Sequence, residues 1–99
     1  MIIPHKQLAD FSKRWKIREL ALFGSILRDD FKPDSDVDVL VDFEPDAQWT
    51  LFDLRHMREE LRQIFGCEVD LLTRRAVERS LNQRRKRAIL STARVIYAT

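Results

Sequence analysis

The segment 36–43, Asp-Val-Asp-Val-Leu-Val-Asp-Phe, constrains the fold of this 99-residue chain more than any other. Apolar residues at alternate positions predict a β-strand with one buried face. Asp36 and Asp38 then lie together on the opposite face. Two neighbouring carboxylates repel each other and Asp disfavours strands, so the pair needs a physical reason. A bound divalent cation would remove the repulsion; the alternative is a solvated pair at a strand end.

Helix and strand periodicity continues on both sides of this segment. The 51–65 segment has apolar residues at helical spacing, a capping box formed by Thr50 and Asp53, and Gly66 at the position of a C-terminal cap. Helices are predicted over 4–15, 26–30, 51–65, 74–80 and 82–90, and strands over 17–23, 36–43, 67–72 and 94–97. This order predicts a single α/β (α+β) domain, residues 1–99, with a small mixed sheet flanked by helices.

A third aspartate, Asp70, falls inside the predicted strand 67–72. If that strand lies beside 36–43, Asp70 joins Asp36 and Asp38 in one cluster. Three carboxylates would then hold two metal ions about 3.5–4 Å apart, which is the arrangement used for in-line phosphoryl transfer. The alternative is again an exposed residue at a strand end.

The Gly24-Ser25 turn separates the strand 17–23 from the short helix predicted over 26–30. A glycine at such a turn lets a phosphate approach the backbone, and a helix N-terminus presents free N–H groups to it. Ser25 is also a good N-cap residue, and Gly-Ser before a helix is usually an ordinary cap, so the turn alone is weak evidence for phosphate binding.

Composition and charge exclude some classes of protein. No apolar run approaches the ~20 residues that span a bilayer, and the single cysteine, Cys67, cannot form an internal disulfide. Both features favour a cytoplasmic protein. Residues 74–94 hold eight Lys/Arg and one acidic residue, whereas the rest of the chain is net acidic. The basic run 84–87 is consistent with binding to nucleotide phosphates, a partner or RNA, or with a solvated helix face.

Trp49 follows a polar loop and precedes the helix 51–65. Packing against the core is the favoured role, and stacking on a nucleobase or contact with a partner is the alternative.

The combination of these motifs is more specific than any one of them. Gly-Ser, ten residues, Asp-x-Asp at the head of an apolar strand and a later strand Asp resemble the nucleotidyltransferase superfamily typified by DNA polymerase β. Within it, the chain is most similar to minimal nucleotidyltransferase (MNT) domains over nearly its whole length. The matching positions are Gly24, Ser25, Arg28, Ser35, Asp36, Asp38 and Asp70. Leu27 and Asp29 stand where the family often has Ala and Gly, which affects the shape of the loop and not the metal site.

This resemblance implies a polymerase β palm-like fold and an ATP- and Mg²⁺-dependent transfer of AMP to a hydroxyl group. Small MNT proteins are typically antitoxins that AMPylate a tyrosine of a HEPN ribonuclease toxin, so a HEPN protein is the implied partner. The resemblance implies catalytic and metal-binding roles, with two Mg²⁺ ions, for Asp36, Asp38 and Asp70. It implies nucleotide binding by Gly24, Ser25 and Arg28.

Three other functions stay open on the sequence. A binding-only antitoxin would occlude its toxin without chemistry, although it would not need clustered aspartates. A nucleotidyltransferase could instead act on a small molecule or RNA, although the small-molecule enzymes usually carry a second domain for the acceptor. A basic RNA-binding domain would bind RNA in a salt-dependent manner even without the aspartates.

Overall fold

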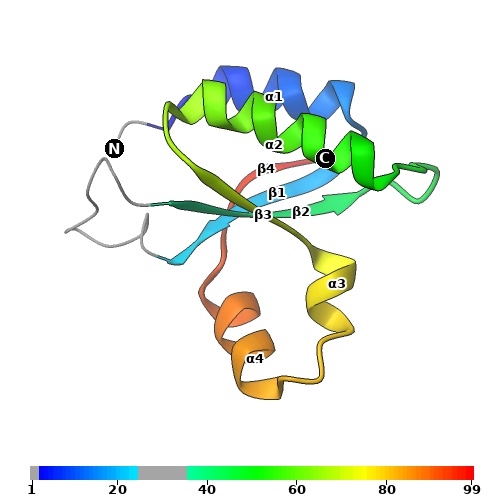
Figure 1. Ribbon diagram of the computed structural model, residues 1–99, viewed down its shortest axis with the longest axis vertical. Coiled ribbons are helices and arrows are strands. Elements are labelled where there is room, and N and C mark those ends of the chain that lie inside the picture. Colours follow the sequence, from blue (N-terminus) through cyan, green and yellow to red (C-terminus); the bar gives the residue numbers. More distant parts are fainter. Residues whose placement is uncertain (1–2, 25–35) are drawn as a thin grey trace.

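A computed structural model describes residues 3–24 and 36–99 (Figure 1). The elements in chain order are α1 (His5–Arg14), β1 (Ile17–Phe23), β2 (Val37–Phe43), α2 (Leu51–Phe65), β3 (Val69–Thr73), α3 (Arg74–Glu78), α4 (Gln83–Thr92) and β4 (Arg94–Ala98). The helix predicted over 26–30 and the Ser25 cap lie outside the described residues.

The four strands form one mixed sheet in the order β3-β2-β1-β4. β1 is antiparallel to both β2 and β4, whereas β2 and β3 run parallel. The parallel pair is possible because α2 connects the two strands as a crossover. The predicted α+β class with a small mixed sheet is therefore confirmed.

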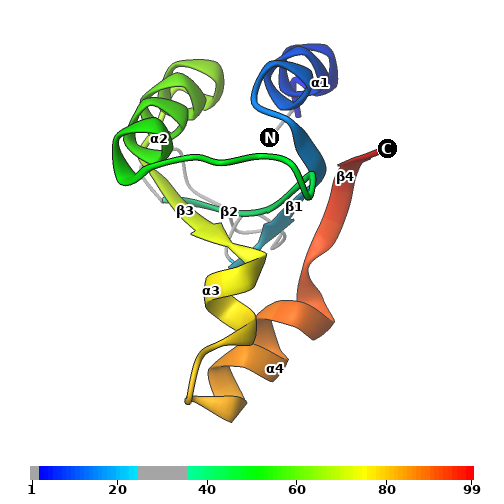
Figure 2. The same ribbon diagram turned by 90° about the vertical axis from the view of Figure 1, so that its right-hand side faces the viewer.

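Helices cover both faces of the sheet, with α1 and α2 on one side and α3 and α4 on the other (Figures 1 and 2). Residues 20–23 of β1 are apolar and buried on both faces of the sheet, as expected for a strand covered on both sides. The larger cluster of fully buried side chains lies under α1 and α2: Leu8, Phe11, Ile17, Leu20, Leu22, Val37, Val39, Val41, Met57, Leu61 and Val69. The smaller cluster lies under α3 and α4: Ala21, Phe23, Leu40, Val77 and Ile89.

Local sequence signals fix α2 most firmly. The Thr50 side chain accepts a hydrogen bond from the Asp53 backbone N–H, and the Asp53 carboxylate accepts one from the Thr50 N–H, so the capping box is present. Gly66 ends the helix in the left-handed conformation at φ 74°. The predicted bounds, 51–65, are confirmed.

Other predicted bounds need correction. The third strand begins at Val69 rather than residue 67, because its parallel ladder with β2 starts at the Val37–Val69 pair. α4 starts one residue after its N-cap, Asn82, and continues to Thr92 rather than ending near residue 90. The first helix covers His5–Arg14, one residue shorter at each end than predicted.

Trp49 packs in the protein, as favoured from the sequence. Its Nε1–H donates to the Trp15 carbonyl at 2.8 Å, and the two indole rings meet edge-to-face with centroids 5.2 Å apart. Of the helices within the described residues, none has the length and apolarity needed to cross a membrane.

Candidate active site

The predicted site forms where β1 ends and where β2 and β3 begin. Asp38 and Asp70 are register partners on the parallel strands β2 and β3. Adjacent strands lie about 4.8 Å apart, so their backbones hold these two carboxylates side by side. Leu40 and Leu72 follow two residues later on the same strands. Leu40 belongs to the apolar cluster under α3 and α4, and Leu72 packs against it. Because side chains alternate along a strand, Asp38 and Asp70 point to that same side of the sheet.

Gly24 brings the end of β1 against this pair. A Cβ atom at residue 24 would collide with the Oδ2 atom of Asp38, and its φ of 75° is in the left-handed region that favours glycine. Glycine is therefore required here for two reasons: the backbone conformation and the close approach of the Asp38 carboxylate. Gly24, predicted from the sequence to bind phosphate, lies next to the carboxylates. A phosphate-binding turn would have to be at this place.

The carboxylates act on one another electrostatically. Burial raises the pKa of the partly buried Asp38 above its ordinary value, and the negative charges of Asp70 and Asp36 raise this pKa further. The Arg85 guanidinium on α4 opposes this rise. Asp36 is exposed and directly precedes β2. A concentration of negative charge at the head of two parallel strands is therefore a property of the described structure.

The donor chemistry of this cluster suits a hard divalent cation. Mg²⁺ prefers one or two carboxylates together with water and phosphate oxygens, and Asp38 and Asp70 supply two neighbouring carboxylates. Within residues 3–24 and 36–99, no three His, Cys, Asp or Glu side chains are gathered closely enough to hold one ion. The two aspartates therefore fit a metal ion that takes its remaining ligands from water and a nucleotide. The three-aspartate metal site stays a prediction.

Two of the predicted nucleotide-binding residues, Ser25 and Arg28, lie outside the described residues. One residue was not singled out from the sequence: Arg85 on α4, whose charge acts on Asp38 from the helix layer that covers the same face of the sheet. Its only signal was membership of the basic run 84–87. That run does not indicate which of its members faces the sheet.

Comparisons with known proteins agree with this arrangement. The profile of the nucleotidyltransferase domain family matches residues 5–96. Protein adenylyltransferase MntA of Thermococcus cleftensis is 35% identical over 78 residues, covering 79% of this chain and 75% of the relative.

Two solved structures show the same fold. The first, a toxin–antitoxin with AMP-PNP, has a TM-score of 0.74 and 16% identity and covers 97% of this chain and 74% of that one. The second is tri-AMPylated Shewanella oneidensis HEPN toxin in complex with MNT antitoxin. Its TM-score is 0.64 at 15% identity, and it covers 96% of this chain and 70% of that one. At these identities the likeness establishes the fold, and the sequence match establishes the relationship. The chain therefore belongs to the nucleotidyltransferase domain family, in its minimal, MntA-like branch, and is an enzyme of that class.

Proposed function

We propose that this protein is an antitoxin that transfers AMP from ATP, with Mg²⁺, onto a tyrosine hydroxyl of a cognate HEPN ribonuclease toxin. The observation that carries the proposal is the Asp38–Asp70 register pair facing Gly24, in a chain that is 35% identical to a protein adenylyltransferase. The AMPylated HEPN toxin bound to a similarly folded antitoxin supports the choice of acceptor.

The protein would promote this reaction mainly by positioning the acceptor hydroxyl and the triphosphate. The acceptor oxygen bonds to the α-phosphorus, the bond from that phosphorus to the bridging oxygen breaks, and pyrophosphate leaves. The reacting atoms must be held about 3–3.5 Å apart and in line. Gly24 and Ser25 would hold the β- and γ-phosphates, and Arg28 would assist them.

The aspartates would divide the remaining work. Asp36, Asp38 and Asp70 would hold Mg²⁺, which supplies charge neutralisation and Lewis-acid polarisation at the phosphates when bound. Asp70 is exposed at the head of an edge strand, so an incoming hydroxyl can reach it. Its carboxylate would take the proton that the tyrosine loses.

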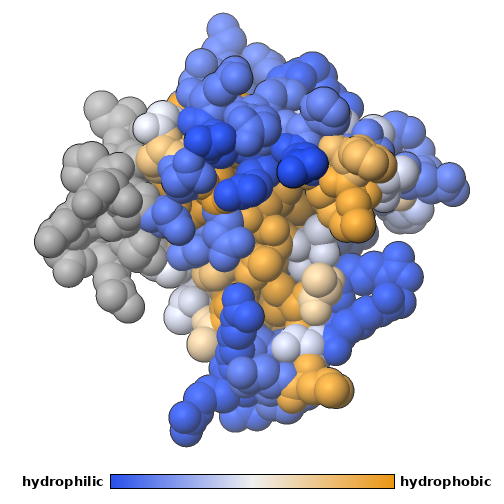
Figure 3. Space-filling view, in the orientation of Figure 1, coloured by the Kyte–Doolittle hydropathy of each residue, from blue (hydrophilic) through white to orange (hydrophobic). Residues whose placement is uncertain are grey.

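The described surface offers a place for contact with a protein acceptor. Leu51 and Phe52 at the start of α2 are 83% and 75% exposed, and Figure 3 shows apolar surface at that end of α2 and between α2 and α3. Exposed apolar surface of this kind is typical of contact with another protein. Cys67, partly buried and without a disulfide partner, is consistent with a cytoplasmic location.

Transfer of label from ATP tests the proposal. The purified protein, a candidate cognate HEPN protein and Mg²⁺ are incubated with ATP labelled at the α-phosphate. Wild type should label the HEPN protein, and Asp38→Asn should not. Asp42→Asn is the matched control, because Asp42 lies on the same strand and pairs with Arg18 at 2.6 Å. This substitution should leave labelling intact. Neutralisation of the toxin by wild type and Asp38→Asn alike, without label, would make the protein a binding-only antitoxin.

A further inference from the structure

The basic run 84–87 on α4 is not one uniform charged face. Arg85 and Lys86 line the cavity between α3, α4 and the sheet, whereas Arg84 is exposed and does not line it. Arg87 lies with Gln83 and Leu90 along a different hollow of the surface, which Lys86 also lines. Only two members of the run therefore face the side of the sheet that carries Asp38 and Asp70.

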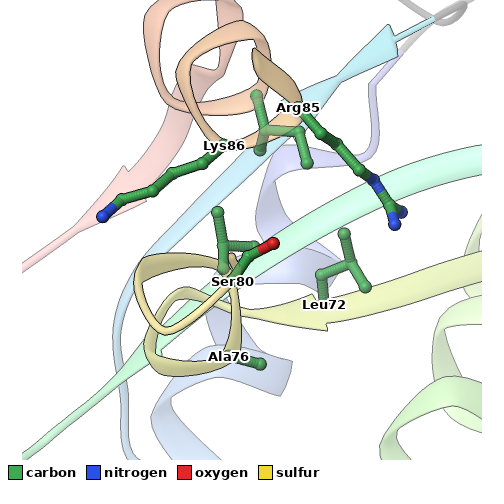
Figure 4. Close-up of a pocket in the computed structure, with 7 residues that line it drawn as sticks. Leu72, Ala76, Ser80, Arg85 and Lys86 are labelled. Carbon is green, nitrogen blue, oxygen red and sulfur yellow. The ribbon is translucent and has the colours of Figure 1, made fainter. Parts of the chain in front are cut away.

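These two members have different surroundings. The Lys86 ammonium donates to the Glu78 carbonyl oxygen at 3.0 Å, which ties α4 to the end of α3. Arg85 and Leu72 of β3 line the same cavity, and the Arg85 side chain points away from Lys86, toward the side where Leu72 lies (Figure 4). Within the described part of the chain, its guanidinium forms no hydrogen bond or ion pair, so its donors are available to a ligand.

The backbone of Arg85 is well fixed. Asn82 caps α4, and its side-chain oxygen accepts a hydrogen bond from the Arg85 N–H at 3.0 Å. Ile89, one turn further along, is buried in the cluster under α4. The Arg85 side chain therefore extends from a first helical turn that is capped by Asn82 and anchored by Ile89.

Charge balance gives this guanidinium a role. Asp38 and Asp70 already concentrate negative charge on the side of the sheet that α4 covers, and a nucleoside triphosphate would bring about four more negative charges, so a cation on that side would be favourable. A guanidinium presents a planar fork of donors that matches two phosphate oxygens. Among the described residues, the positive charge of Arg85 acts on Asp38, which is consistent with a position near a ligand of that carboxylate.

We propose that Arg85 binds a phosphate group of the nucleoside triphosphate held at the Asp38–Asp70 site and is a nucleotide-binding residue of this enzyme. The proposal rests on the proposed function only for the identity of the nucleotide. It assigns to α4, a helix outside the Gly-Ser and Asp-x-Asp motifs, a direct part in substrate binding.

Direct binding measurements on the isolated protein test this assignment without the toxin. Affinities for ATP, ADP, AMP and adenosine are measured by calorimetry with Mg²⁺ for wild type, Arg85→Ala and Arg85→Lys. Arg84→Ala is the matched control, because it removes an equal charge one residue away. Arg85→Ala should weaken ATP binding at least about tenfold, as expected for loss of a charge-assisted hydrogen bond. It should leave adenosine binding unchanged.

The other variants separate binding from general electrostatics or packing. Arg85→Lys should recover part of the ATP affinity, and Arg84→Ala should bind ATP like wild type. The assignment would be overturned if Arg85→Ala bound ATP as tightly as wild type. It would also be overturned if Arg85→Ala lost as much affinity for adenosine as for ATP, or if Arg84→Ala lost as much ATP affinity as Arg85→Ala. Failure of AMP transfer to a HEPN protein with this binding pattern intact would contradict the proposed function and leave the role of Arg85 standing.

Discussion

Gly24 lies directly against the Asp38 carboxylate, so that any β-carbon at residue 24 would occupy the space of Oδ2. The end of β1 and the start of β2 are thus in close contact at the place where nucleotide and metal would bind. The contact brings together a turn glycine and a strand aspartate that stand apart in the sequence.

Gly24→Ala should therefore abolish AMP transfer. A left-handed Ala costs about 1–2 kcal/mol, and the new methyl group would also displace the Asp38 side chain. Gly66→Ala is the control: Gly66 has nearly the same positive φ, 74°, but a Cβ there meets nothing within 4 Å. Both variants should lose similar backbone stability in urea denaturation, and only Gly24→Ala should lose activity. Equal activity in the two variants would contradict the fit between Gly24 and Asp38.

Magnesium should stabilise the wild-type protein, because it would relieve the repulsion between Asp38 and Asp70. In EDTA, Asp70→Asn should raise the melting temperature slightly, since like charges at paired positions on neighbouring strands cost roughly 0.2–1 kcal/mol. Adding Mg²⁺ and ATP should raise the melting temperature of wild type and Asp42→Asn but not of Asp70→Asn. Differential scanning calorimetry measures both effects. An equal response of Asp70→Asn to Mg²⁺ and ATP would argue against Asp70 as a ligand.

Leu61 tests the layer that supports the site. It is fully buried between α2 and the sheet, and its replacement by Ala should lower the free energy of unfolding by about 2–5 kcal/mol. Leu81, 96% exposed between α3 and α4, is the control, and Leu81→Ala should change stability by less than about 0.5 kcal/mol. Similar urea midpoints for the two variants would mean that the α2 layer is packed differently from this description.

Glu60 makes stability depend on pH in the acid range. Its hydrogen bonds from Arg14 and the Trp15 indole hold the pKa of its carboxyl below the ordinary value of 4.5. A carboxyl whose pKa is lower in the folded protein contributes stability above its unfolded pKa, and this contribution disappears as pH falls through the folded pKa. The stability difference between wild type and Glu60→Gln should thus be largest near neutral pH and shrink below about pH 4.5. Urea denaturation at several pH values measures it, and a difference that grows toward acid pH would have the wrong sign.

Much of this fold is predictable from local chemistry. The bounds of α2 follow from the Thr50–Asp53 capping box and from Gly66, which act within a few residues of the helix ends. The alternation from Val37 to Phe43 likewise predicts both the strand and the side that carries Asp38, because a period of two fixes which face is buried.

The site itself depends on relationships that the sequence pattern does not encode. The pairing of Asp38 with Asp70 requires β3 to lie parallel to β2 in one particular register, and strand order is set by packing over the whole sheet. The approach of Gly24 to Asp38 and the direction of Arg85 depend on how separate elements meet. β3 starts at Val69, two residues later than predicted, for the same reason. Its start is set by pairing with β2, and that pairing begins at Val37.

The central claim, transfer of AMP to the partner, is tested most directly by intact-protein mass spectrometry of the HEPN protein coexpressed with this chain. Coexpression with wild type should add the mass of one or more AMP groups, and peptide mapping should place them on tyrosine. Asp38→Asn should leave the mass unchanged, and Asp42→Asn should behave like wild type. An unmodified HEPN protein that copurifies with wild type, or equal modification by Asp38→Asn, would contradict the account.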